Sequence, residues 1–376
     1  MTIDAAAAQE GVHRNSWVPM IGLFLAQMLM SFNVALLPVS LGAMVDEFDT
    51  PPTTVAATIV VYGLVVAALV MVGAKIGQKV GWLRMFRVVV AMFAVSSVVL
   101  IVSPNIGWAI AGQGLAGACA AIIVPALVAL IAENYMGEQQ ATAVGSLGSA
   151  RALSGVSAFL IGGALASSAS WRWSFVIVLA IAVAVFALSF GLRADTPNKS
   201  VEIDVVAAVL FGASIVLITV GFQNLNAWGV WFAARDAPFD IVGVSPAPLL
   251  VVTGLIVGQG FFLWTRARVR AGKTPLVDLS VLSTSRERSA IYAMFIVVAM
   301  EAALNFTVPL YIQIVQGRSP FDTALAMLPF NLTVFVTAMV VVKFYKRFSP
   351  RVIGVASFLL TTIALVWLAY VVSNNW

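Results

Sequence analysis

Long uninterrupted apolar runs constrain this chain more than any other feature. A helical run of about 20 apolar residues matches the hydrocarbon thickness of a bilayer. The chain is 61% hydrophobic and 10% charged, whereas a globular domain averages about 25% charged residues. Because these runs are continuous rather than alternating, they predict an all-α, polytopic transmembrane helix bundle and not a barrel. Eleven spans are predicted, at 17–45, 54–74, 86–102, 106–132, 143–168, 173–192, 205–222, 248–264, 290–312, 323–342 and 352–372.

The basic residues predict the orientation. Of the 21 Lys and Arg residues, all except Arg151, Arg172, Arg235 and Arg318 fall on one side of the predicted membrane. Lys and Arg concentrate in cytoplasmic loops. We therefore expect a multi-pass protein of a bacterial inner (plasma) membrane with its N-terminus in the cytoplasm. These loops also account for the net charge of +5, so membrane lipid is an expected partner and nucleic acid is not.

Two similar basic loops indicate an internal repeat. "KIGQKVGWLRMFR" joins the second and third spans, and "KFYKRFSPR" joins the tenth and eleventh. Corresponding loops at corresponding places are typical of transporters built from two parallel halves. We predict a cytoplasmic tail (1–16), an N-terminal six-helix half (17–193), a linker with an inserted helix pair (194–289), and the first three helices of an incomplete C-terminal half (290–376). We expect three further helices to complete that half.

One carboxyl group stands in the middle of an apolar run. Glu301 lies near the centre of the ninth predicted span, where an acidic residue costs about 2.5–3.5 kcal/mol, so it should face the bundle interior or a water-filled cavity. Asn305 is four residues on and shares its helix face. The pair is either a proton-coupling or substrate-binding patch, or a protonated carboxyl that makes one structural hydrogen bond between helices.

Other polar residues within spans are weaker candidates. Arg151, in the fifth span, is either the counter-charge of Glu301 or a side chain that reaches the headgroups. Gln27 and Asn33, in the first span, either line a cavity or bond neighbouring helices.

The fifth span also carries a stripe of small residues at every fourth position. A stripe of this kind lets two helix backbones approach closely, so it predicts tight helix packing. Its members are Ala150, Ser154, Ala158, Gly162 and Ala166.

Several classes of site are excluded. Cys119 is the only cysteine and His13 the only histidine, which excludes an internal disulfide and a multi-histidine metal site. The segment "GQGLAG" formally matches a dinucleotide-binding loop, but it lies inside an apolar span with Gly112 and Ala116 four residues apart, so it predicts helix packing. No phosphate loop, catalytic triad or metal cluster is present, and we expect neither a cofactor nor enzymatic activity.

At the level of longer motifs, the sequence resembles the major facilitator superfamily, in its fourteen-span drug:proton antiporter branch. The segments that carry the resemblance are "PLYIQIVQGRSPFDTALAMLP", "PLVDLSVL", "SWRWSF" and "NVALLP". The resemblance covers nearly the whole chain and implies a major facilitator fold with about 11 of its spans present, arranged as six, two inserted and three of six.

The gating and coupling motifs of that branch are altered here. In the loop motif after the second span, Gln78 replaces the family's acidic residue and Trp82 a basic one, while Lys79 and Gly81 are retained. The resemblance implies a role for those two residues in gating.

Within the spans, Gln113 occupies the position of the family's membrane arginine. In the antiporter motif of the fifth span, Phe159 replaces proline while Gly162 and Gly163 are retained, and the resemblance implies a gating role for these two glycines. These departures remove groups that the family associates with gating or proton coupling.

Three functions remain open. The first is a monomeric proton-coupled secondary transporter that exports amphipathic, drug-like molecules, with protons as the second partner. The second is a degenerate, non-transporting member that acts as a membrane scaffold. The third is a facilitator that moves a lipid or metabolite without proton coupling.

Overall fold

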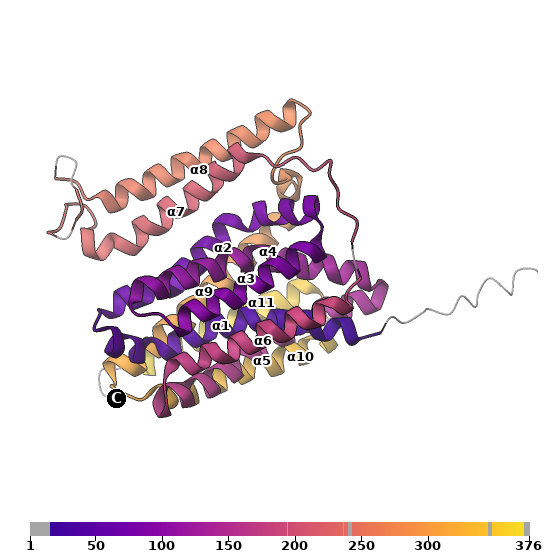
Figure 1. Cartoon of the computed structure of the whole chain (residues 1–376). Coiled ribbons are helices and arrows are strands. Elements are labelled where there is room, and N and C mark those ends of the chain that lie inside the picture. Colours follow the sequence, from indigo (N-terminus) through magenta and orange to yellow (C-terminus); the bar gives the residue numbers. More distant parts are fainter. Residues whose placement is uncertain (1–15, 194, 236, 240–242, 345–347, 372–376) are drawn as a thin grey trace, which may run out of the picture.

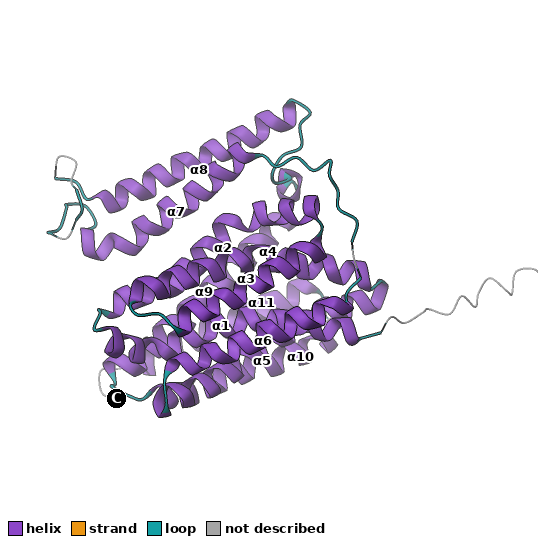
Figure 2. Ribbon diagram, in the orientation of Figure 1, coloured by secondary structure: helices purple, strands orange, loops and turns teal. Residues whose placement is uncertain are grey.

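The computed structural model describes residues 16–193, 195–235, 237–239, 243–344 and 348–371. This part of the chain is helical, apart from loops and one β-bridge between Phe232 and Val244 (Figure 2). The helices are α1 (Val18–Phe48), α2 (Pro52–Val80), α3 (Trp82–Ile101), α4 (Ile106–Asn134), α5 (Gly137–Ser168), α6 (Trp171–Leu188), α7 (Val205–Trp228), α8 (Pro246–Arg270), α9 (Ser285–Leu310), α10 (Pro320–Phe344) and α11 (Pro350–Val371).

The predicted fold class is confirmed. Ten of the helices are long and apolar enough, over their described residues, to cross a membrane. Most helices begin or end a few residues outside the predicted spans, because the helix continues past the apolar run into the polar loop. Short turns follow three of them: a 3-10 turn at Ser189–Gly191, another at Leu279–Leu282 and a π-turn at Tyr311–Val315.

Helices α1 to α6 form one tightly packed lobe around a common apolar core. Helices α2 and α4 cross closely, because two glycines remove the side chains that would keep the backbones apart. A Cβ at Gly117 would lie 2.6 Å from the Tyr62 carbonyl oxygen, and one at Gly73 would lie 2.7 Å from that of Ala121. The predicted packing role of the "GQGLAG" segment is thus supported by its contacts.

We expect Gly117→Ala to lower the thermal unfolding temperature of the purified protein in detergent. The added methyl would press on backbone that cannot rotate away, at a cost of about 1–3 kcal/mol. Gly63→Ala is the matched control, because no atom lies within 4 Å of a Cβ there. That change should be neutral or stabilising, since alanine favours a helix over glycine by up to about 1 kcal/mol. Equal melting temperatures for the two variants would contradict the close crossing.

Helices α7 and α8 pair with each other to one side of this lobe, next to α2 (Figure 1). Asp204 fixes the start of the pair: its Oδ1 accepts the Ala207 N–H at 3.1 Å, and its carboxylate also contacts the Trp264 indole at 3.1 Å and the Arg268 Nε at 3.2 Å. One buried carboxylate therefore caps α7 and ties it to α8.

Helices α9 to α11 follow in the chain, and we call them the second lobe. They contact the first lobe mainly where α10 packs against α5, with smaller contacts of α9 and α10 on α1. The small-residue stripe of α5 is buried at Ala150, Ser154, Ala158 and Gly162, and it faces α1: the Ser154 hydroxyl donates to the Met28 carbonyl oxygen at 3.3 Å. The stripe thus packs closely, as predicted, and the structure shows that its partner is α1.

The turn between α2 and α3 and the linker after α6 lie together at one end of the bundle, which we name the basic end because Lys79 and Arg84 lie there. Here the Asn198 N–H, in the linker after α6, donates to the Gln78 carbonyl oxygen at 2.9 Å.

At the opposite end, Arg172 joins three elements: it donates to the carbonyl oxygens of Ile101 (3.0 Å) and Ser103 (2.6 Å) and pairs with Glu47. The "SWRWSF" segment therefore anchors α1, α3 and α6 together.

Candidate functional site

An ion pair joins the two lobes at mid-height. The Nη2 of Arg151, on α5, lies 3.0 Å from both carboxylate oxygens of Glu301, on α9. The two side chains are 55% and 36% exposed, so the pair borders open space and is not sealed in a dry contact. Of the two readings of Arg151, the counter-charge is the one this geometry supports.

Asn305 lies beside this pair but does not contact the Glu301 carboxylate. Its Nδ2 donates to the backbone carbonyl oxygen of Glu301 at 3.0 Å, within the same helix. The Asn305 side chain is half-buried.

Asn33 and Gln113 form a buried amide pair between α1 and α4. Each donates to the other, at 3.0 and 3.4 Å, and their exposures are 1% and 0%. A buried amide is stabilised only when its donors and acceptors are matched, and this pair matches them. Gln113 thus places a neutral side chain, hydrogen-bonded to Asn33, where the family has a membrane arginine. Because Gln113 is buried, the structure gives no support to its contact with substrate.

Gln27 is the α1 candidate that stays accessible. It is half-buried and its Nε2 donates to the Ser31 hydroxyl at 3.0 Å, one helical turn away. A role in lining a cavity remains a prediction for this residue.

Gln313, which sequence reasoning did not single out, joins the lobes at the end opposite the basic end. It lies in the π-turn after α9, and its side-chain amide makes two hydrogen bonds with one turn of α1. Its Nε2 donates to the Pro38 carbonyl oxygen at 3.0 Å, and its Oε1 accepts the Gly42 N–H at 3.2 Å. These two backbone groups are the i and i+4 partners of that turn. The absence of a side chain on Gly42 permits the approach, because a Cβ there would lie 3.1 Å from Oε1.

Apolar residues close the same end. Val39 on α1, Phe159 on α5, and Ala324 and Met327 on α10 form one buried cluster. Near it, the Ser167 hydroxyl accepts the Phe321 N–H at 3.1 Å. Phe159, which stands where the family has proline, therefore packs between the lobes.

Towards the basic end, α9 makes little contact with the first lobe. Nearly all its side chains between residues 285 and 298 are exposed. The contacts between the lobes thus lie at the ion pair and beyond it, away from the basic end.

The residues retained in the loop motif shape the turn between α2 and α3. Gly81 has a φ of 104°, which favours glycine, and a Cβ there would lie 3.3 Å from Pro197 in the linker after α6. Lys79 is exposed at the end of α2, where a cation favours the helix dipole. The Asp195 carboxylate accepts the N–H groups of Trp82 (2.6 Å) and Leu83 (3.0 Å) and so caps α3.

In the motif of the fifth span, both retained glycines are buried. A Cβ at Gly162 would lie 2.5 Å from the Leu36 side chain on α1. Gly162 thus allows the close packing of α5 on α1, and the gating role of both glycines remains a prediction.

The pKa values of two groups outside the spans are shifted by local contacts or burial. The pKa of Asp278 is lowered because its carboxylate accepts the Ser280 N–H at 2.9 Å. Burial raises the pKa of Tyr135, whose hydroxyl donates to the Ser16 carbonyl oxygen at 3.0 Å. Neither group lies near the ion pair. Among the described residues, no group of three His, Cys, Asp or Glu side chains is placed to hold a metal ion.

The described helices thus form a multi-pass bundle in which an ion pair joins α5 to α9. Residues 23–376 match the Major Facilitator Superfamily, and the chain belongs to that family.

Curated relatives agree with this membership. The chain is 25% identical over 355 residues to the "Multidrug efflux pump LfrA" of Mycolicibacterium smegmatis, covering 93% of this chain and 67% of the relative. It is 24% identical to the "Lincomycin resistance protein" of Streptomyces lincolnensis (91% and 68% covered) and 27% identical to the "Efflux pump dotC" of Dothistroma septosporum (85% and 53% covered). The chain thus spans between about half and about two thirds of the length of these relatives.

Solved structures share the fold. A peptide transporter POT in complex with sulfate matches with a TM-score of 0.57 at 15% identity, covering 88% of this chain and 69% of that one. The human organic anion transporter MFSD10 matches with a TM-score of 0.50 at 12% identity, covering 85% and 70%.

Proposed function

We propose that this chain forms a proton-coupled secondary transporter that exports amphipathic, drug-like molecules across the bacterial inner membrane, with its N-terminus in the cytoplasm. The observation that carries the proposal is the ion pair between Arg151 and Glu301, because it links the two lobes and borders open space. The names of three relatives, two efflux pumps and a lincomycin resistance protein, support export of small molecules.

The ion pair provides a physical route for coupling. When Glu301 is ionised, its attraction to Arg151 favours contact between α5 and α9 at mid-height. Protonation of Glu301 removes that attraction, and a cationic or polar group of the substrate would compete for the same carboxylate. Either event changes the relative stability of the two arrangements of the lobes, which is what coupled transport requires.

In this scheme, the described conformation is closed at the end opposite the basic end. Gln313 and the cluster of Val39, Phe159 and Met327 hold that end together. Opening there would require these contacts to separate, while the lobes approach at the basic end.

Proteoliposomes test the proposal directly. The purified chain would be reconstituted with a pH-sensitive dye inside and challenged with ethidium as the amphipathic probe. We expect ethidium addition to cause proton movement, and an imposed proton gradient to drive ethidium accumulation. Ethidium transport without proton movement would indicate the uncoupled facilitator, which the neutral Asn33–Gln113 pair favours. No transport of any probe would favour the scaffold.

A further inference from the structure

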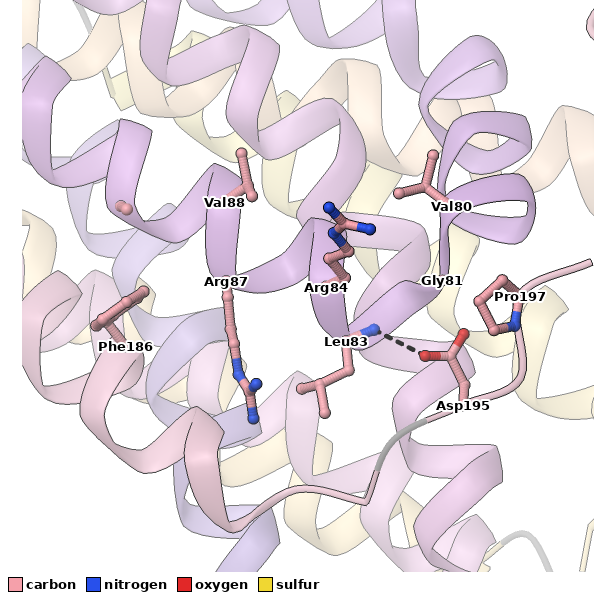
Figure 3. A pocket seen from close by; sticks show the side chains of 10 residues that line it. Val80, Gly81, Leu83, Arg84, Arg87, Val88, Phe186, Asp195 and Pro197 are labelled. Carbon is pink, nitrogen blue, oxygen red and sulfur yellow. Dashed lines mark hydrogen bonds between the residues drawn. The ribbon is translucent and has the colours of Figure 1, made fainter.

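A second site lies away from the lobe interface, at the basic end. A groove of about 650 Å³ opens on the surface of the first lobe between the start of α3, the end of α6 and the linker that follows α6 (Figure 3). Neither the ion pair nor the contacts of Gln313 take part in it, so the transport mechanism leaves this groove without a role.

One wall of the groove is a single face of α3 that changes from charged to apolar. Arg84, Arg87, Val88 and Ala91 all line it, at spacings of three and four residues. The seven steps from Arg84 to Ala91 rise about 10 Å along the helix, from the basic end into the membrane-spanning region. Val88 and Ala91 are exposed, and Phe186 of α6 faces them across the groove.

The two arginines differ in how they are held. Arg87 is tied to the end of α6: it donates to the Ser189 carbonyl oxygen at 3.0 Å and lies over the Phe190 ring at 4.5 Å. Arg84 is exposed and has no hydrogen bond or ion pair with another residue in the described part of the chain. Figure 3 shows the two guanidinium groups pointing apart, with that of Arg84 between Val80 and Val88.

The acidic residue of the groove does not neutralise Arg84. Both oxygens of Asp195 accept N–H groups from the first turn of α3, at Trp82 and Leu83. Its negative charge is therefore balanced by the positive end of that helix. The groove keeps one guanidinium group available for an anion.

We propose that this groove binds an anionic glycerophospholipid, with its phosphate on Arg84 and an acyl chain along Val88 and Ala91. The order of the groups along α3, cation first and apolar residues deeper, is the order of headgroup and acyl chain in a leaflet. Cytoplasmic leaflets are anionic, and basic pockets between helices on that side bind lipid headgroups. The bound lipid would also pack against Pro197, and so against the linker that holds the turn at Gly81.

Native mass spectrometry of the purified chain tests this, with phosphatidylglycerol as the probe and phosphatidylcholine as the neutral comparison. We expect selective retention of phosphatidylglycerol, reduced about fivefold by Arg84→Gln, since one basic residue near an anionic surface contributes about that factor. Ala91→Trp should also reduce retention by filling the apolar part without changing the charge. Arg270→Gln, which removes an exposed arginine outside the groove, is the matched control and should leave retention unchanged.

Three results would overturn the proposal. Equal loss in the Arg84→Gln and Arg270→Gln variants would mean that lipid follows net charge alone. Full retention in Ala91→Trp would remove the acyl chain from the groove. Competition by inorganic phosphate at equal concentration would identify a site for free anion instead of lipid. Thermal unfolding of each variant in detergent shows that it folds, and should Arg84→Gln fail to fold, Ala91→Trp carries the test.

Discussion

Glu301→Gln is expected to abolish proton movement driven by ethidium in proteoliposomes. Glutamine keeps the size and the hydrogen-bonding capacity of the side chain but cannot take up or release a proton, so coupling should fall at least about tenfold. Arg151→Gln should cause a similar loss, because it leaves the Glu301 carboxylate without its partner in the inter-lobe contact.

The double variant separates a shared role from two independent ones. If Arg151 and Glu301 act as a unit, Arg151→Gln combined with Glu301→Gln should lose no more coupling than either single change, a non-additive result. Glu138→Gln, the same chemical change in the exposed first turn of α5, is the matched control and should retain full coupling. Normal proton movement in Glu301→Gln would exclude this carboxyl from the mechanism.

Gln313→Leu is expected to open the end opposite the basic end. The change removes two hydrogen bonds between the lobes, to Pro38 and Gly42, worth together about 1–3 kcal/mol. That corresponds to a shift of about 5–150-fold in the ratio of closed to open states. No backbone group of α1 is left unpaired on opening, since the Pro38 carbonyl and the Gly42 N–H are partners within their own turn.

Alkylation of one engineered cysteine measures this shift. Met327→Cys, in a Cys119→Ser background, places a thiol in the apolar cluster, where the native side chain is 3% exposed. We expect a membrane-impermeant maleimide to label it at least about fivefold faster in the Gln313→Leu protein. Gln316→Leu, the same change three residues along, is the control, because no described residue bonds to the Gln316 side chain. Equal labelling rates in all three proteins would show that Gln313 does not hold this end closed.

Gln313→Glu adds a test based on charge. A carboxylate accepts the Gly42 N–H but repels the Pro38 carbonyl oxygen, whereas the protonated acid donates to that oxygen. Labelling at Met327→Cys should therefore be faster at high pH than at low pH in this variant, and independent of pH in the Gln313 protein once the reactivity of the thiol itself is corrected for. If the ratio of the labelling rates of the two proteins did not change with pH, the two hydrogen bonds assigned to Gln313 would be contradicted.

Much of the fold follows from local properties of the sequence. The length and continuity of the apolar runs were sufficient to predict the fold class, and the small-residue stripe from Ala150 to Gly162 was sufficient to predict a close helix contact. Departures from the family motifs also directed attention to Gln113 and Phe159. Their partners, however, were not predictable, because the same residue in a helix can bond a neighbouring helix, line a cavity or face lipid without any change in the pattern.

The clearest case is Arg151, for which the sequence left two readings open. A long cationic side chain in a span reaches either the headgroups or an interior acid, and the choice depends on a helix 150 residues further along the chain. Gln313 is a residue whose role could not be predicted from the sequence at all. It stands in an apolar segment with no neighbouring charge to mark it, and its role depends on a turn of α1 that lies 271 to 275 residues earlier in the sequence.

The sequence by itself determined that this chain consists of membrane-length helices and that few side chains in the spans carry chemistry, and it predicts that the basic loops gather on one side. The tertiary structure alone decided which of these side chains meet: Arg151 with Glu301, Asn33 with Gln113, and Gln313 with α1. The physical reason is that bilayer thickness and helical periodicity act within each segment, whereas the pairing of polar groups is set by how distant helices pack.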